Sequence, residues 1–167
     1  MDAWEPVHHA ILKANMGLNG LAVACHAEAV GTALGVGTVR FDIVTSDLGL
    51  FNAGGAGVVT TSDRYGVTAR FGKPTVQRYD FIKIDVEGEE ADVWEALQPQ
   101  LSQDGPITVC LEFTPRHHAD PASFLRKVQE DGFMLGTVVP DGYTRRCSLE
   151  EALVPDTGDF RMLWLTK

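Results

Sequence analysis

The chain has 167 residues, of which 44% are hydrophobic and 22% are charged, and its net charge is −9 at pH 7. This length and composition predict a single globular domain over residues 1–167. The negative charge argues against nucleic acid as a partner, because binding phosphates needs clustered Lys and Arg. No apolar run approaches the roughly 18 residues that would span a bilayer, so no membrane partner is expected.

The cysteines and the first residues of the chain predict a cytoplasmic protein. The three cysteines include no Cys-x-x-Cys pair, which fits a reducing compartment and no disulfide framework. The opening MDAWEPVHHA has no basic stretch followed by an apolar one, so no signal peptide is expected.

The first half of the chain predicts one helix, two strands and a long connection. Apolar residues at helical spacing predict a helix over residues 5–16, with Pro6 in its first turn. Alternating apolar residues predict strands over residues 21–26 and 38–45. Residues 46–78 are rich in Gly, Ser and Thr, and a connection of that length is usually functional or mobile.

The second half of the chain predicts four strands and two helices. The strands are expected at residues 81–86, 107–113, 133–139 and 160–166, with the last two paired antiparallel. The helices are expected at residues 89–101, disturbed late by Pro99, and from a cap at Asp120 to Gly132. Strands that alternate with helices predict an α/β fold with a mostly parallel sheet and a C-terminal antiparallel hairpin.

Carboxylates follow the first of these four strands, in the segment DFIKIDVEGEE at residues 80–90. Asp85 and Glu87 are two positions apart, so they lie on one face at the end of the strand, where open α/β sheets bind ligands. As catalytic candidates they could orient a hydroxyl group, take its proton or face a positive charge. The structural alternative is that one of them caps the next helix while the other pairs with Lys83.

Further polar residues lie at and after the end of the next strand. Glu112 would sit beside Asp85 if the two strands are neighbours, and it is a second catalytic candidate. One of His117 and His118 could act as a base near neutral pH, although exposed loop histidines are usually only solvated. Carboxylates and a histidine could together hold Mg²⁺, but no spacing demands it, and no metal is expected.

Three segments of the chain resemble the FkbM-type methyltransferase family. Residues 79–90 resemble the family's DFIKIDVEGEE signature, and ITVCLEFTP at residues 107–115 resembles the next strand. Glu5-Pro6, followed by the Leu-Asn pair at residues 18–19, resembles an earlier run. The resemblance implies a Rossmann-like class I fold and an enzyme that uses S-adenosylmethionine to methylate hydroxyl groups.

The resemblance also implies roles for individual carboxylates. Glu5 would accept hydrogen bonds from the cofactor ribose, although it could instead be a helix-terminal Glu stabilised by the helix dipole. Glu28 would lie on the adenine side of the cofactor. Asp85 and Glu87 would lie at the reaction centre, and Asp85 is also a candidate contact of the cofactor.

The family begins with a strand and a Gly-rich turn that cradles the cofactor's methionine part, and here four residues precede Glu5. We therefore expect an N-terminally truncated domain without its first strand and helix. The expected activity is O-methylation of a sugar or another small secondary-metabolite hydroxyl. The alternative is a catalytically inactive remnant that acts as a binding or oligomerisation module, for example as a homodimer, because unpaired sheet edges favour association.

Overall fold

The computed structural model describes residues 6–32, 35–40, 44–45, 51–52, 66–72, 78–86, 88–155 and 160–167. The chain forms two compact units, residues 1–74 and residues 75–167. In these described segments, no helix combines the length and the apolar character that a membrane crossing requires.

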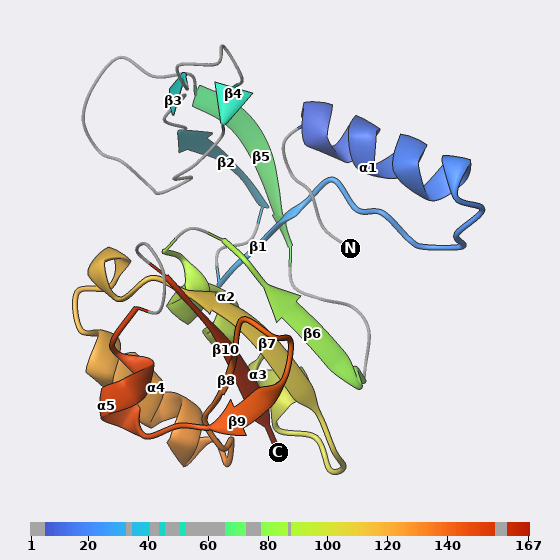
Figure 1. Cartoon of the computed structure of the whole chain (residues 1–167). Coiled ribbons are helices and arrows are strands. Elements are labelled where there is room, and N and C mark those ends of the chain that lie inside the picture. Colours follow the sequence, from blue (N-terminus) through green and yellow to red (C-terminus); the bar gives the residue numbers. More distant parts are fainter. Residues whose placement is uncertain are drawn as a thin grey trace. The chain divides into compact units, whose positions relative to one another are not determined.

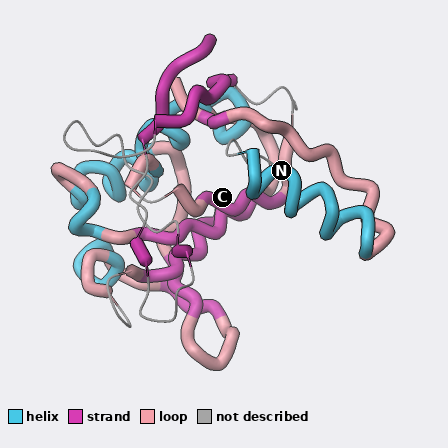
Figure 2. The backbone as a smooth tube through the Cα atoms, turned by 90° about the horizontal axis from the view of Figure 1, so that it is seen from above, coloured by secondary structure: helices cyan, strands magenta, loops and turns pink. Residues whose placement is uncertain are grey.

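The first unit contains helix α1 (Pro6–Leu18), which confirms the helix expected at residues 5–16. Proline suits the start of a helix, because its missing N–H would have no partner there. Residues 19–28 carry no helix or strand and form part of the pink loop that follows α1 in Figure 2. The strand expected at residues 21–26 is therefore wrong, because so short an alternation does not by itself specify a pairing partner.

A three-stranded sheet with the order β1–β5–β2 also belongs to the first unit. Its strands are β1 (Ala29–Val30), β2 (Gly35–Arg40) and β5 (Gly66–Gly72). Strand β5 runs parallel to β1 and antiparallel to β2. A separate antiparallel pair consists of β3 (Val44–Thr45) and β4 (Phe51–Asn52).

These strands correct the expectations for the middle of the chain. The strand expected at residues 38–45 is recovered in part, as the end of β2 and as β3, while residues 41–43 lie outside the described residues. The connection expected over residues 46–78 is wrong where it contains β4 and β5. A signal for β5 was present, because apolar and polar residues alternate in VTARF at residues 67–71.

The second unit contains a five-stranded sheet with the order β6–β7–β10–β8–β9 (Figure 1). Its strands are β6 (Phe81–Ile84), β7 (Thr108–Phe113), β8 (Gly136–Val138), β9 (Thr144–Arg146) and β10 (Arg161–Thr166). The β6–β7 pair is parallel, and the other three pairs are antiparallel. The fold is mixed α/β as expected, but the expected mostly parallel sheet is wrong.

The direction of β10 explains this difference. Strand β10 lies between β7 and β8 and runs antiparallel to both, so β6, β7 and β8 all point the same way. Strand β9 then adds a hairpin to β8. The alternation of strands and helices correctly indicated strands of one direction, and the antiparallel pairing of the two terminal strands is confirmed. The alternation of strands and helices could not show that the last strand would insert between two earlier strands.

The helices of the second unit are α2 (Glu90–Ala96), α3 (Gln98–Leu101), α4 (Pro121–Glu130) and α5 (Leu149–Ala152), with a 3₁₀ turn at Pro115–His117. The break at Leu97 confirms the disturbance expected from Pro99, whose ring nitrogen cannot donate a helical hydrogen bond. The cap of α4 is also confirmed, because the Ser123 N–H donates to Asp120 Oδ1 at 2.9 Å.

One face of this sheet is buried, because residues along β7 and β10 alternate between buried and half-buried. The Trp94 ring of α2 lies edge-on to Phe124 of α4, with 6.2 Å between the ring centroids, and Phe133 is 5.1 Å away. Phe124 also lies 5.9 Å from Phe113 of β7. Helices α2 and α4 therefore cover the same sheet face, and its core contains Ile84, Val109, Leu111, Phe113, Leu163 and Leu165.

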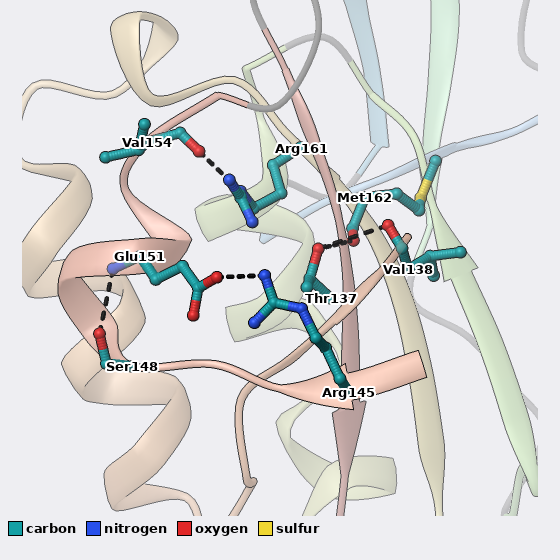
Figure 3. Close-up of polar contacts among 8 residues, drawn as sticks. All are labelled: Thr137, Val138, Arg145, Ser148, Glu151, Val154, Arg161 and Met162. Carbon is teal, nitrogen blue, oxygen red and sulfur yellow. Dashed lines mark hydrogen bonds and ion pairs between the residues drawn. The ribbon is translucent and has the colours of Figure 1, made fainter. Parts of the chain in front are cut away.

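Polar contacts connect the C-terminal elements of the second unit (Figure 3). Arg145 of β9 and Glu151 of α5 point toward each other and form an ion pair. Ser148 caps α5 by accepting a hydrogen bond from the Glu151 N–H at 3.1 Å, and Arg161 Nε donates to the Val154 carbonyl at 2.6 Å. Helix α5 was not expected from the sequence, although a Ser followed three residues later by Glu is a helix-start signature.

Asp131 connects the helices on the buried side of the sheet. Its Oδ2 atom accepts hydrogen bonds from Trp94 Nε1 at 2.8 Å and from Gln98 Nε2 at 2.9 Å, and its Oδ1 atom pairs with Lys127. Burial raises the pKa of Asp131, but the hydrogen bonds from these three side chains outweigh it and leave the pKa below its ordinary value. The folded state therefore favours the charged carboxylate.

We expect Asp131→Ala to lower the free energy of unfolding by about 2 kcal/mol, because it leaves the buried Trp94 N–H without an acceptor. Urea denaturation followed by circular dichroism measures this loss. As a control, Glu130→Ala at an exposed position should change the free energy of unfolding by less than about 0.5 kcal/mol. Because the folded pKa is depressed, the stabilisation from Asp131 is complete above about pH 4 and is lost as the pH falls further. An equal effect of the two variants would contradict this role.

Candidate active site at the ends of two parallel strands

The carboxyl ends of β6 and β7 meet at one edge of the second unit's sheet. Ile84 is paired in register with Leu111, so the residues that follow them, Asp85 and Glu112, come next to each other along the two strands. The structure therefore brings these two candidates together, as expected if β6 and β7 are neighbours. Strand ends of this kind are where α/β sheets place ligand-binding groups.

Asp85 forms an ion pair with Lys83, which matches the structural alternative considered for this residue. The side chains are 39% and 51% exposed, respectively. An exposed pair of this kind contributes about 0–1 kcal/mol, because solvent screens the attraction. The pairing is therefore weak enough to be exchanged for a ligand, and the Asp85 carboxylate is accessible to one.

The Cys110 thiol lies on the half-exposed face of the sheet and feels the charges of Lys83, Asp85 and Glu112. Burial raises the pKa of the Cys110 thiol; Lys83 lowers it, whereas Asp85 and Glu112 raise it further. The balance is a raised pKa, so the thiol stays protonated at neutral pH and is a poor nucleophile. The chemistry of this face therefore comes from its carboxylates and its lysine.

Glu5, Glu28 and Glu87 are the remaining predicted site residues. Glu87 and Glu5 lie outside the described residues. Glu28 belongs to the first unit, where it is half-buried immediately before β1. No group of three or more His, Cys, Asp or Glu side chains that could hold a metal ion occurs within the part of the chain that the structure describes.

The structure adds a buried carboxylate–imidazole pair that the sequence analysis did not predict. Glu90 is the first residue of α2, and His118 follows the 3₁₀ turn after β7. Glu90 Oε2 and His118 Nε2 are 2.9 Å apart, with side chains only 2% and 5% exposed. His118 is therefore not the solvated loop residue that its position suggested, and no local spacing in the sequence indicates the pair.

The surroundings of Glu90 favour its charged form. Burial raises its pKa, but the His118 side chain and the Gly88 N–H, which donates to Glu90 Oε1 at 2.9 Å, outweigh it. The pKa of Glu90 is consequently lowered from its ordinary value. A carboxylate that is both buried and ionised is unusual unless it is paired and hydrogen-bonded, as it is here.

Comparison with known proteins identifies the region that contains this site. Residues 59–136 match the family model described as the methyltransferase FkbM domain. This match supports the FkbM-type methyltransferase family. Neither a curated protein nor a solved structure matches the chain. The family match confirms the resemblance, and the FkbM region includes Asp85, Glu90, Glu112 and His118 but neither Glu5 nor Glu28.

Proposed function

We propose that the chain is an S-adenosylmethionine-dependent O-methyltransferase that acts on a hydroxyl group of a sugar or small secondary metabolite. The observation that carries the proposal is the position of Asp85 and Glu112 at the adjoining ends of β6 and β7, within the FkbM region. The three co-directional strands β6, β7 and β8 support a Rossmann-like class I arrangement.

The residues present fit the proposed cofactor chemically. The accessible carboxylate of Asp85 suits a ligand that carries a positive charge, and Glu28 and Glu5 are the carboxylates proposed to accept hydrogen bonds from its nucleoside part. When bound, S-adenosylmethionine supplies an electrophilic methyl group. A catalytic metal is not part of the proposal.

The carboxylates would act on the acceptor hydroxyl. Asp85 or Glu87 would accept the hydroxyl proton as the oxygen forms its bond to the methyl carbon, and the carbon–sulfur bond would break with its electrons going to sulfur. Glu112 would help to orient the acceptor beside Asp85. Positioning supplies much of the acceleration of such an in-line displacement, and a general base adds about 10²–10⁴-fold.

Calorimetric titration of the 167-residue chain with S-adenosylmethionine and S-adenosylhomocysteine tests the cofactor assignment. We expect micromolar binding. The Glu5 carboxylate would accept hydrogen bonds from two ribose hydroxyls, and the accessible Asp85 would provide a second charge-assisted contact. Glu5→Ala should abolish the heat, whereas Glu130→Ala, which removes an exposed carboxylate from α4, should leave it unchanged.

A folded chain that gives no heat with either ligand would overturn the assignment. Such a result would favour the alternative, a methyltransferase-like module that binds another chain. Sedimentation of the same sample would then show a dimer. In the described sheet, β6 is one of the two outermost strands and would be available for such pairing.

A further inference from the structure

The first residue of α2 and the segment that follows β7 are joined by a buried polar contact. Glu90 Oε2 and His118 Nε2 face each other at 2.9 Å, and neither atom has a well-aligned hydrogen-bond partner in the described structure. The His118 ring is stacked on Phe124 at 5.3 Å and lies 4.8 Å from Phe113. The imidazole is therefore held by two aromatic rings and presents its Nε2 edge to Glu90.

The same carboxylate also holds the turn that follows Asp85. The Gly88 N–H donates to Glu90 Oε1, so one side chain contacts both the turn after β6 and the segment after β7. Gly88 has φ +107°, and a Cβ atom there would lie 3.0 Å from His117 Cβ. The two segments therefore approach each other so closely that only glycine fits without strain.

Stability alone is a weak explanation for such a pair. Removing a carboxylate and an imidazole from water has a large desolvation cost, and a buried pair often contributes no more than apolar residues of the same size. Conformational specificity is the better-supported use of buried polar pairs. Here the conformation that the pair specifies is that of the backbone at Gly88, three residues after the candidate Asp85.

We infer that Glu90 and His118 are positioning residues that hold the backbone at Gly88, which follows Asp85 and the end of β6. The inference rests on the proposed function, since it gives the pair a purpose in methyl transfer. His118 is anchored by the aromatic rings, Glu90 is oriented by His118, and Gly88 is held by Glu90. Movement of the backbone at Gly88 would shift Asp85 relative to Glu112, which follows the in-register pair Ile84–Leu111.

Amide hydrogen exchange measured by NMR tests the contact without requiring turnover. We expect the protection of the Gly88 amide to fall about 10-fold or more in Glu90→Ala, because its acceptor is lost, and to fall in His118→Phe, which keeps a stacking ring. Glu90→Gln should keep most of the protection, since it retains an acceptor. Asp131→Ala is the control, because it breaks a half-buried carboxylate network that does not include Gly88.

Methyl-transfer kinetics at a temperature where every variant is folded supply the second readout. We expect kcat to fall about 10–100-fold in Glu90→Ala and His118→Phe with little change in the acceptor KM, and Glu90→Gln to recover part of it. Asp131→Ala should retain wild-type kcat. Equal losses of Gly88 protection in Asp131→Ala and Glu90→Ala would overturn the inference, as would full kcat in Glu90→Ala. A wild-type chain that binds no cofactor would instead overturn the proposed function, and the exchange data would still decide whether the pair holds the turn.

Discussion

Trp94→Ala is expected to lower the free energy of unfolding by about 3–5 kcal/mol, one of the largest losses available to a single substitution. The indole is 1% exposed and packs against Phe124 and Phe133, so truncation leaves a cavity beneath the sheet. It also removes the N–H that donates to Asp131. Urea denaturation followed by far-ultraviolet circular dichroism measures the loss.

Two further variants separate packing from hydrogen bonding at Trp94. Trp94→Phe keeps an aromatic ring but no donor, and we expect a smaller loss of about 1–3 kcal/mol. Val154→Ala, at a position whose residue is 58% exposed, should change the free energy of unfolding by less than about 0.5 kcal/mol. A Trp94→Ala chain as stable as Val154→Ala would show that α2 does not contribute to the core as described.

Asp85→Asn is expected to lower methyl transfer by about 10²–10⁴-fold while leaving the fold intact. The substitution keeps the size of the side chain but removes its ability to accept a proton, and the exposed pair with Lys83 contributes little to stability. Transfer of a labelled methyl group from S-adenosylmethionine to a panel of sugar and small-molecule hydroxyls measures the effect.

Lys83→Gln is the matched control for Asp85, because it breaks the same ion pair from the other side. If Asp85 acts on the acceptor, Lys83→Gln retains most of the activity and the double variant is no worse than Asp85→Asn alone. If Asp85→Asn and Lys83→Gln each cause the same small loss of activity, Asp85 serves only as the ion-pair partner of Lys83. That result would remove it from the reaction centre.

The sequence by itself determined most helices and strands of the second unit and the place of its candidate site. Helix and strand periodicity, the Asp120 cap and the effect of Pro99 are local properties, and the structure confirms each of them. The position of Asp85 at the end of a strand followed from the same local pattern. The family resemblance also depended on contiguous residues, and the FkbM match confirms it.

Only the tertiary structure decided which distant segments meet. The insertion of β10 between β7 and β8 turned an expected parallel sheet into a mainly antiparallel one, because pairing depends on hydrogen bonds between strands far apart in sequence. The burial of His118 against Glu90 likewise depends on the neighbouring ends of β6 and β7 and on the aromatic rings beneath them. Local composition marks a histidine as polar, but the packing around it determines whether it faces water or a buried carboxylate.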